Sequence, residues 1–311
     1  MNNKSKCILA IDAGGTFLKA ALIRENGESA RLVEGSFFKI PVDSGGNAEE
    51  IKAAYIEVAS RGRSLSQKNK MRLEGISICI PGPFDYPAGI SRMRHKYQSI
   101  YGISMRPWLE QAVGKVPVYF LHDSTAFLLG ATQNGLSSRY QRIAGVVLGT
   151  GLGFASMFDG KIYENDQGGP GISIYAMPYR GKAAEDYVSR HALISHYMEL
   201  RQGSGRCNGA FSGDSEMDVI DIASLARSGQ TDAIQAFESM GICLAEILYD
   251  IIRDNRFECL LLGGGICKSA DLFLPALRGI LEEIPTLKVI EAITDIDHAS
   301  LPGAARAMQF S

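Results

Sequence analysis

The first group of residues that could do chemistry lies near the start of the chain. An apolar run ends at Asp12 and leads through Ala13 and two glycines to Thr16. In a turn of this composition the backbone N–H groups can face a phosphate, while the carboxylate holds the water shell of a magnesium ion. An aspartate before a glycine turn can also serve only to cap an ordinary hairpin, so both interpretations stay open.

Two further glycine turns follow strand-like runs later in the chain. Residues 148–153 read Leu-Gly-Thr-Gly-Leu-Gly and lie between the apolar runs 143–147 and 154–158. Residues 260–265 read Leu-Leu-Leu-Gly-Gly-Gly and lead into a helix-like segment. Three such turns predict a nucleotide bound between two halves of the chain.

A second aspartate stands where a predicted strand meets a predicted helix. The strand over 116–121 is followed by His122, Asp123 and Ser124, and the helix is predicted over 125–131. Ligands of open α/β sheets gather beyond the carboxyl ends of the strands, so this place suits a catalytic carboxylate. Aspartate is also a common N-cap residue, and a capping role for Asp123 remains the alternative.

Composition narrows the class of protein. The 311 residues exceed the length at which one core usually stops growing, which predicts two domains. The 32 basic and 34 acidic side chains give a formal net charge of −2, without a basic block that would suit nucleic acid or an anionic membrane. The chain shows no signal-peptide pattern, and its long uncharged stretch over 143–158 is too short to span a bilayer, so we expect a cytoplasmic protein.

The cysteines form no C-x-x-C pair. We expect them to be buried apolar groups or free thiols, because neither a disulfide framework nor a zinc site fits their spacing. The six cysteines are Cys7, Cys79, Cys207, Cys243, Cys259 and Cys267.

The elements that must position these groups form two α/β units. In the first half we predict strands over 7–12, 17–23, 31–40, 75–80 and 116–121, a turn at Asn26-Gly27, and helices over 48–59, 107–113 and 125–131. In the second half, besides the strands around the glycine turns, we predict helices over 182–200, 231–253 and 270–283, a loop over 201–215, a strand over 288–293, and a last helix from Leu301 that packs on the first domain.

The three glycine turns, Pro81-Gly82-Pro83 and the terminal Gly303-Ala304-Ala305 make the chain similar to the ROK family of bacterial sugar kinases. The resemblance covers nearly the whole chain. It implies an α/β, two-domain actin-like ATPase (ribonuclease H-like) fold with an interdomain cleft. We place the N-terminal domain at 1–121 plus 297–311 and the C-terminal domain at 122–296.

The resemblance also implies an ATP-dependent kinase that phosphorylates a hydroxyl of a sugar or modified sugar. The family's catalytic aspartate follows an asparagine at the end of a strand, before a helix. His122 and Asp123 occupy that place in this chain, so Asp123 becomes the expected general base. The expected nucleotide-binding residues are Asp12, Gly14, Gly15, Thr16, Lys19, Gly149, Thr150, Gly151, Gly263, Gly264 and Gly265. Asp12 would hold Mg²⁺ through water. The expected sugar-binding residues are Pro81, Gly82, His122 and Glu185.

The chain departs from the family on the sugar side. The Gly-Glu-x-Gly-His motif is replaced by the residues from Pro170 to Tyr175, and no cysteine occurs between Cys79 and Cys207, so we expect no zinc site. A family asparagine is replaced within 95–98, His-Lys-Tyr-Gln. These changes predict an acceptor with an added acyl, amino or acidic group in place of glucose.

Three details stay open at the level of sequence. Glu185 could instead be a solvent-facing residue in the first turn of a helix. A sugar-responsive regulator of the ROK type shares this domain, although such regulators carry a helix-turn-helix ahead of it, and the phosphate strand here begins at Cys7. A non-catalytic relative without sugar contacts is the third possibility. The resemblance makes a homodimer the expected assembly.

Overall fold

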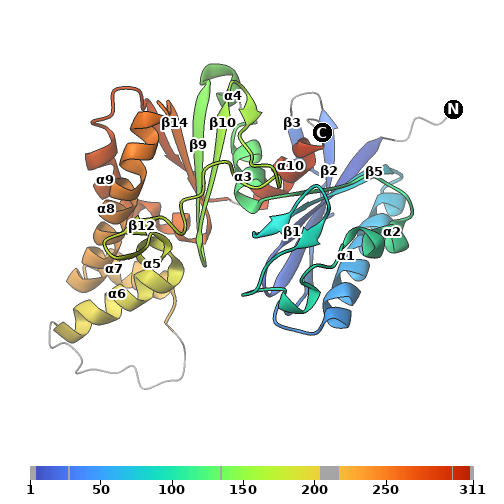
Figure 1. Cartoon of the computed structure of the whole chain (residues 1–311), viewed down its shortest axis with the longest axis horizontal. Helices are drawn as coiled ribbons and strands as arrows, with labels where there is room; N and C mark the ends of the chain where they lie inside the picture. Colours follow the sequence, from blue (N-terminus) through green and yellow to red (C-terminus); the bar gives the residue numbers. More distant parts are fainter. Residues whose placement is uncertain (1–4, 27–28, 134, 204–216, 296, 309–311) are drawn as a thin grey trace. The chain divides into compact units, whose positions relative to one another are not determined.

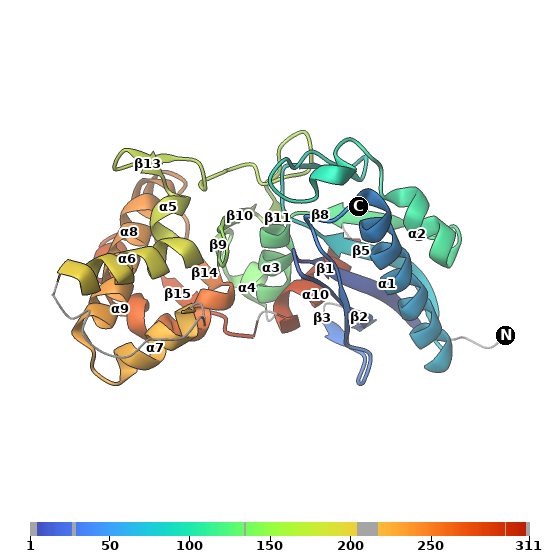
Figure 2. The same cartoon turned by 90° about the horizontal axis from the view of Figure 1, so that it is seen from below.

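The computed structural model describes residues 5–26, 29–133, 135–203, 217–295 and 297–308, and the chain forms two compact units (Figures 1 and 2). Unit 1 comprises Met1–Arg139, Gly160–Ile172 and Asp295–Ser311, and unit 2 comprises Tyr140–Asp159 and Ser173–Thr294. Each unit is built around its own β-sheet.

The sheet of unit 1 has the strand order β3-β2-β1-β5-β8, and β4 also pairs with β2. Strand β1 runs antiparallel to β2 and parallel to β5, which runs parallel to β8. The elements are β1 (Lys6–Ala13), β2 (Phe17–Asn26), β3 (Ser29–Leu32), β4 (Phe38–Pro41), α1 (Ala48–Lys68), β5 (Arg72–Cys79), β6 (Phe84–Asp85), β7 (Ile90–Ser91), η1 (Gln98–Ile100), α2 (Arg106–Val113), β8 (Val118–Leu121), α3 (Asp123–Ala131), α4 (Leu136–Arg139), β11 (Lys161–Ile162) and α10 (Asp297–Ala307).

Helices cover both faces of this sheet. Helices α1 and α2 pack together on one face, and α3 and α10 pack together on the other (Figure 2). Leu9 and Ile11 of β1 share a buried cluster with Tyr55 of α1, as the alternation of strand side chains requires. The predicted last helix is confirmed and begins earlier than expected, at Asp297.

Helix α1 is longer than its apolar pattern indicated. It begins at a capping box in which Asn47 and Glu50 satisfy each other's backbone N–H groups. It runs to Lys68, beyond the expected end at residue 59. Gly62 lies within this helix. Its missing side chain leaves room for Leu9, which a Cβ would meet at 2.4 Å.

Two short strands replace the single strand predicted over 31–40, so that prediction is wrong. Strand β3 ends at Leu32 and β4 begins at Phe38, although both pair with β2. Between them Gly35 takes a left-handed backbone conformation with φ of 68°, which glycine adopts without strain. Of the turn predicted at Asn26-Gly27, Gly27 lies outside the described residues.

In unit 2, strands β10, β9, β14 and β15 lie side by side in this order. Strand β9 runs antiparallel to β10 and parallel to β14, which runs parallel to β15. The elements are β9 (Arg142–Leu148), β10 (Leu152–Phe158), β12 (Pro178–Tyr179), β13 (Lys182–Ala183), α5 (Glu185–Val188), α6 (Arg190–Gly203), α7 (Val219–Arg227), α8 (Thr231–Asp254), β14 (Cys259–Gly263), η2 (Gly265–Ser269), α9 (Ala270–Leu281) and β15 (Val289–Ala292).

The helix predicted over 182–200 is interrupted. Helix α5 ends at Val188 and α6 begins at Arg190, because the residue between them, Ser189, is extended. The predicted loop over 201–215 falls mostly outside the described residues, and so does Cys207. Helix α7 was not predicted.

Helix α8 is the centre of the helical part of unit 2 and packs against α5, α6, α7 and α9. Within the described ranges, none of the helices combines the length and the apolar character that crossing a membrane would need.

Helices α3 and α10 cross with their backbones in contact. A Cβ on Gly303 would lie 1.8 Å from the carbonyl oxygen of Ala126, and a Cβ on Gly130 would lie 1.8 Å from that of Ala299. This contact groups α3 with α10 in unit 1. The expected domain boundary between residues 121 and 122 would instead place α3 in the C-terminal domain and α10 in the N-terminal domain.

The close crossing predicts that Gly303→Ala lowers the free energy of unfolding by about 1–3 kcal/mol, because the added methyl group forces the helices apart. Gly279→Ala in α9 is the matched control, since a Cβ there meets nothing within 4 Å. The control should be neutral or stabilising by about 0.5–1 kcal/mol. Urea unfolding followed by circular dichroism measures both changes, and equal midpoints for the two variants would contradict the crossing.

Candidate active site

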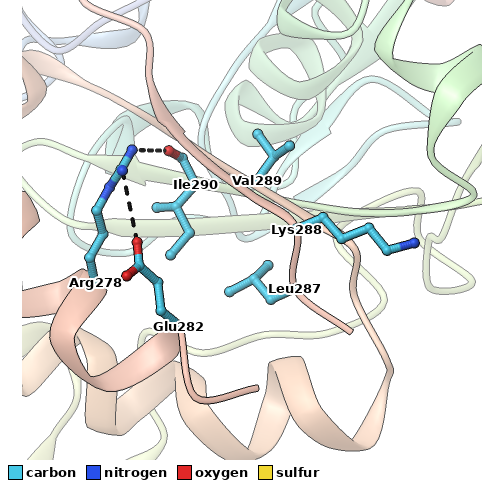
Figure 3. A pocket seen from close by; sticks show the side chains of 6 residues that line it. All are labelled: Arg278, Glu282, Leu287, Lys288, Val289 and Ile290. Carbon is cyan, nitrogen blue, oxygen red and sulfur yellow. Dashed lines mark hydrogen bonds and ion pairs between the residues drawn. The ribbon is translucent and has the colours of Figure 1, made fainter. Parts of the chain in front are cut away.

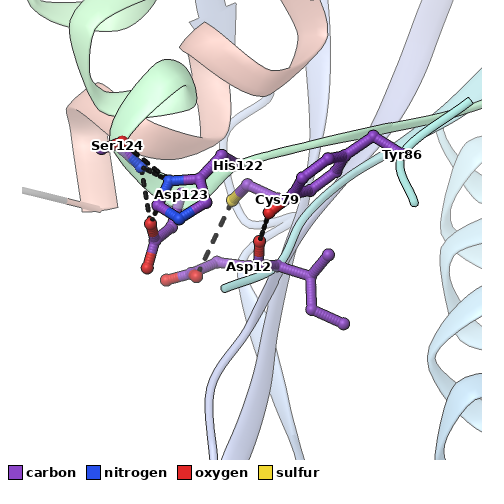
Figure 4. Close-up of polar contacts among 7 residues, drawn as sticks. Asp12, Cys79, Tyr86, His122, Asp123 and Ser124 are labelled. Carbon is purple, nitrogen blue, oxygen red and sulfur yellow. Dashed lines mark hydrogen bonds and ion pairs between the residues drawn. The ribbon is translucent and has the colours of Figure 1, made fainter. Parts of the chain in front are cut away.

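The parallel strands of unit 1 bring the expected general base, Asp123, and the expected magnesium-binding residue, Asp12, to one edge of the sheet. Asp12 of β1 pairs in register with Cys79 of β5, and Cys79 pairs with Leu121 of β8. Strand β8 ends at Leu121, and His122 and Asp123 are the next two residues of the chain. The carboxyl ends of three neighbouring strands therefore carry both aspartates, as Figure 4 shows.

The first glycine turn joins β1 to β2. The Gly14 N–H donates to the carbonyl oxygen of Phe17 at 3.1 Å, which closes the turn. A Cβ on Gly14 would lie 2.9 Å from that oxygen, so the tight turn requires a glycine at this position. Among the residues that the structure describes, the N–H groups of Gly15 and Thr16 have no acceptor. Unused backbone donors side by side suit an anion.

Asp12 lies between a cation and a thiol. Its Oδ2 is 4.0 Å from Nζ of Lys19, which is its cross-strand neighbour. Its Oδ1 accepts from Sγ of Cys79 at 3.7 Å. Burial raises the pKa of Cys79 well above its usual value, and the negative charges of Asp12 and Asp123 raise it further. Cys79 is therefore a buried, neutral thiol, as expected of the cysteines, and its contact with the carboxylate carried no signal in the sequence.

Asp123 is held by one of its two carboxylate oxygens. Oδ1 accepts from the Ser124 N–H at 2.7 Å and lies 2.9 Å from Nδ1 of His122 (Figure 4). Oδ2 has no hydrogen-bond partner within the described part of the chain, and the side chain is 38% exposed. The N-cap of α3 is His122, so capping does not account for the aspartate.

The charge of Asp123 is favoured by its neighbours. Burial acts to raise its pKa, but the charge and hydrogen bond of His122, the Ser124 N–H and the charge of Lys96 together hold the pKa below its usual value. The carboxylate is therefore ionised at neutral pH, and Oδ2 can accept a proton or a hydrogen bond.

His122 and Gly82 lie close together, and their role toward a sugar stays a prediction. A Cβ on Gly82 would be 3.7 Å from Nε2 of His122. The ring of Tyr86 meets the His122 ring edge-on with centroids 6.1 Å apart, and its hydroxyl donates to the carbonyl oxygen of Ile80 at 3.1 Å. Pro81 stands in the sequence between Ile80 and Gly82, the two residues that take part in these contacts. Tyr86 carried no signal in the sequence because its ring contact with His122 is long-range.

The residues that replace the family asparagine divide into two kinds. His95 is exposed and Lys96 is partly exposed. Tyr97 is fully buried, and its hydroxyl donates to the carbonyl oxygen of Gly14 at 2.6 Å. Tyr97 therefore does not line a pocket for the acceptor, because its ring faces the core of unit 1.

The two glycine turns of unit 2 are neighbours. They follow β9 and β14, which run parallel with Val147 opposite Gly263. A Cβ on Gly264 would lie 2.0 Å from the carbonyl oxygen of Leu148, and Gly264 has φ of 101°, so only glycine fits. The first of these turns is anchored by the Arg190 N–H, which donates to the Gly149 carbonyl oxygen at 2.8 Å. Gly265 begins the short helix η2.

Glu185 supports the turn that includes Thr150 and Gly151. Its Oε2 accepts from the Leu152 N–H at 2.9 Å, and a Cβ on Gly151 would lie 2.4 Å from the same oxygen. Glu185 is therefore in contact with the glycine turn, whereas the alternative interpretation had its side chain facing solvent. Its role toward a sugar stays a prediction.

The replaced sugar motif is partly accessible. Ile172 is half-buried and Tyr175 is 48% exposed. The carbonyl oxygen of Tyr175 accepts from the Glu185 N–H at 3.0 Å, so the altered motif is attached to the glutamate that supports the glycine turn.

No group of three or more His, Cys, Asp or Glu side chains within the described ranges is arranged to hold a metal ion. A separate hollow of about 260 Å³ in unit 2 is lined by Arg278, Glu282 and residues 287–290 (Figure 3). Arg278 donates there to the carbonyl oxygen of Ile290 at 2.6 Å and lies 3.8 Å from Glu282. The hollow has none of the features of the glycine turns.

Known proteins resemble the chain along most of its length. The glucokinase of Thermotoga maritima is 22% identical over 87% of this chain and 86% of its own. The N-acetyl-D-glucosamine kinase of Photobacterium profundum is 23% identical over 77% of this chain and 81% of its own. The transcriptional repressor Mlc of Escherichia coli is 25% identical over 70% of this chain, which covers 55% of the repressor.

The fold is shared with solved structures as well. The ROK family glucokinase of Streptomyces griseus, solved with glucose and AMPPNP, superposes with a TM-score of 0.78 at 20% identity and covers 98% of this chain and 100% of its own. The fold is therefore that of the actin-like ATPases, as the sequence predicted. The sequence profile of the ROK family matches residues 8–308. This chain belongs to the ROK family.

Proposed function

We propose that the protein transfers a phosphoryl group from ATP to a hydroxyl of a sugar or modified sugar, with Asp123 as general base. The observation that carries this proposal is the carboxylate of Asp123, which is fixed through Oδ1 and open at Oδ2. A carboxylate that only stabilised the helix would not need to keep one oxygen accessible.

The chemistry follows from this arrangement. The acceptor hydroxyl would donate a hydrogen bond to Oδ2 of Asp123 and transfer its proton there as its oxygen bonds to the γ-phosphorus, while the bond from that phosphorus to the ADP oxygen breaks. Such transfer needs mainly positioning and charge neutralisation from the protein. A well-placed base contributes about 10²- to 10⁴-fold in rate.

The nucleotide and its metal ion fit the remaining residues of unit 1. The open N–H groups of Gly15 and Thr16 are donors for phosphate oxygens, and Lys19 adds a positive charge beside Asp12. Magnesium neutralises phosphate charge when bound, and Asp12 would hold it through water. In unit 2, Gly149, Thr150 and Gly151 would contact the β- and γ-phosphates, and 263–265 would flank adenosine.

The acceptor is proposed to be a hexose with an added group. Ile172 and Tyr175 stand in place of side chains that would bond to plain hydroxyls, and a site built for such hydroxyls discriminates strongly. The charge of Lys96, which acts on Asp123, is available to an acidic or polar substituent. Similarity to an N-acetyl-D-glucosamine kinase supports the same class of acceptor.

A sugar-binding regulator is the alternative, and the similarity to the Mlc repressor is the observation behind it. A turnover measurement distinguishes the two functions, because a regulator binds its sugar without forming a phosphorylated product.

Asp123→Asn tests the base. The amide keeps the size of the side chain but cannot take a proton, so turnover should fall by about 10² or more while MgATP affinity and the unfolding temperature change little. Asp254→Asn is the matched control, because it removes an exposed carboxylate that pairs with Arg253 at 2.8 Å. Steady-state ADP release measures both variants. Turnover of Asp123→Asn within a few-fold of wild type would reject the assignment.

The purified protein should act without zinc, because the family's cysteine cluster is missing from the sequence between Cys79 and Cys207. Elemental analysis should find far less than one zinc ion per chain. A zinc-selective chelator should leave turnover unchanged as long as magnesium is present. Stoichiometric zinc, with activity lost on chelation, would contradict this expectation.

A further inference from the structure

The carbonyl oxygens of the first glycine turn all accept hydrogen bonds from groups outside the turn. Gly14 O accepts from the Tyr97 hydroxyl at 2.6 Å. Gly15 O accepts from the Ser44 N–H at 3.0 Å, and Thr16 O accepts from the Val42 N–H at 2.9 Å. Three consecutive peptide groups are thus oriented by partners outside the turn.

This orientation determines where the turn's own N–H groups point. A trans peptide is planar, and its N–H points opposite to its C=O. The Gly14 carbonyl oxygen points to Tyr97, so the Gly15 N–H points away from Tyr97. By the same geometry the Thr16 N–H points away from Ser44. These are the two N–H groups that have no acceptor within the described residues.

Tyr97 holds this arrangement at two points. Its hydroxyl bonds to Gly14, and its own backbone N–H donates to the carbonyl oxygen of Ser44 at 2.7 Å, next to the Ser44 N–H that holds Gly15. Its backbone is left-handed, with φ of 53°, which is uncommon for a bulky residue and implies a constrained position. The ring is fully buried and packs 6.4 Å from that of Tyr55.

The hydroxyl group is the part of Tyr97 that packing does not explain. A phenylalanine would fill the same space, but it would leave the Gly14 carbonyl oxygen without its donor. Burial raises the pKa of Tyr97 to about 12, so the phenol stays protonated and remains a donor across the physiological pH range.

We propose that Tyr97 is a positioning residue for nucleotide phosphate: by holding the Gly14 carbonyl oxygen, it directs the Gly15 N–H toward the phosphate chain. This inference rests on the proposed function, because it requires that the turn binds ATP. It adds a residue from the segment before α2, which contributes no atom to the turn itself.

The test is MgATP binding to Tyr97→Phe, measured by isothermal titration calorimetry. Loss of one orienting hydrogen bond should weaken MgATP binding about 5- to 10-fold. AMP, which lacks the β- and γ-phosphates, should bind Tyr97→Phe within about twofold of wild type, whereas general loosening of unit 1 would weaken both nucleotides. Tyr197→Phe is the matched control in unit 2, since it removes another buried hydroxyl, which donates to Gln230 at 2.9 Å.

A second measurement uses the wild-type protein and so does not depend on how the variant folds. The amide resonance of Gly15 should shift when MgATP is added and stay in place when AMP is added. Unchanged MgATP affinity in Tyr97→Phe, equal weakening of AMP, or a Gly15 amide that ignores MgATP would overturn the inference while the kinase proposal stands. A wild-type protein that binds no MgATP would instead reject the proposed function, and the role of Tyr97 with it.

Discussion

The parallel register of β1, β5 and β8 is the constraint on which the site depends. Because these strands end at one level, Asp12 and the residues after Leu121 come to one edge of the sheet. The register needs the buried apolar side chains of these strands, and the helices on both faces keep them out of water. A slip by one residue would turn Asp12 into the opposite face and separate it from Cys79.

Within that frame, backbone groups supply donors that the proposed phosphate site would use. The first glycine turn leaves the N–H groups of Gly15 and Thr16 without an acceptor among the described residues, while its carbonyl oxygens accept hydrogen bonds. An anion could therefore bind there without leaving a carbonyl oxygen unpaired. Side chains add to this: Lys19 lies beside Asp12, and His122 lies beside Asp123. The neighbours of Asp123 hold its pKa below the usual value, which favours the ionised carboxylate.

The resemblance to the ROK family predicted the fold, and local patterns predicted many of the strands and helices, because glycine turns, strand ends and helix starts depend on neighbouring residues. The expected site residues stay predictions. The gap between β3 and β4, the break before α6 and the existence of α7 were missed, since apolar periodicity alone does not locate a turn such as Gly35. The role of Tyr97 could not be predicted, because its partner Gly14 lies 83 residues away. Glu185 was found by resemblance, but its bond to Leu152 needed the structure.

Phosphorus NMR of the wild-type protein with ATP, magnesium and one acceptor at a time tests the central claim most directly. Glucose, amino hexoses and N-acetylated hexoses form the panel, and ATP without acceptor is the blank. The account predicts a sugar phosphate resonance that grows in step with ADP for a modified hexose, while glucose stays below the roughly 10⁴ M⁻¹s⁻¹ in kcat/KM at which enzymes commonly work. ADP formation that no acceptor raises above the blank, from a protein that still binds ATP and sugar, would contradict it.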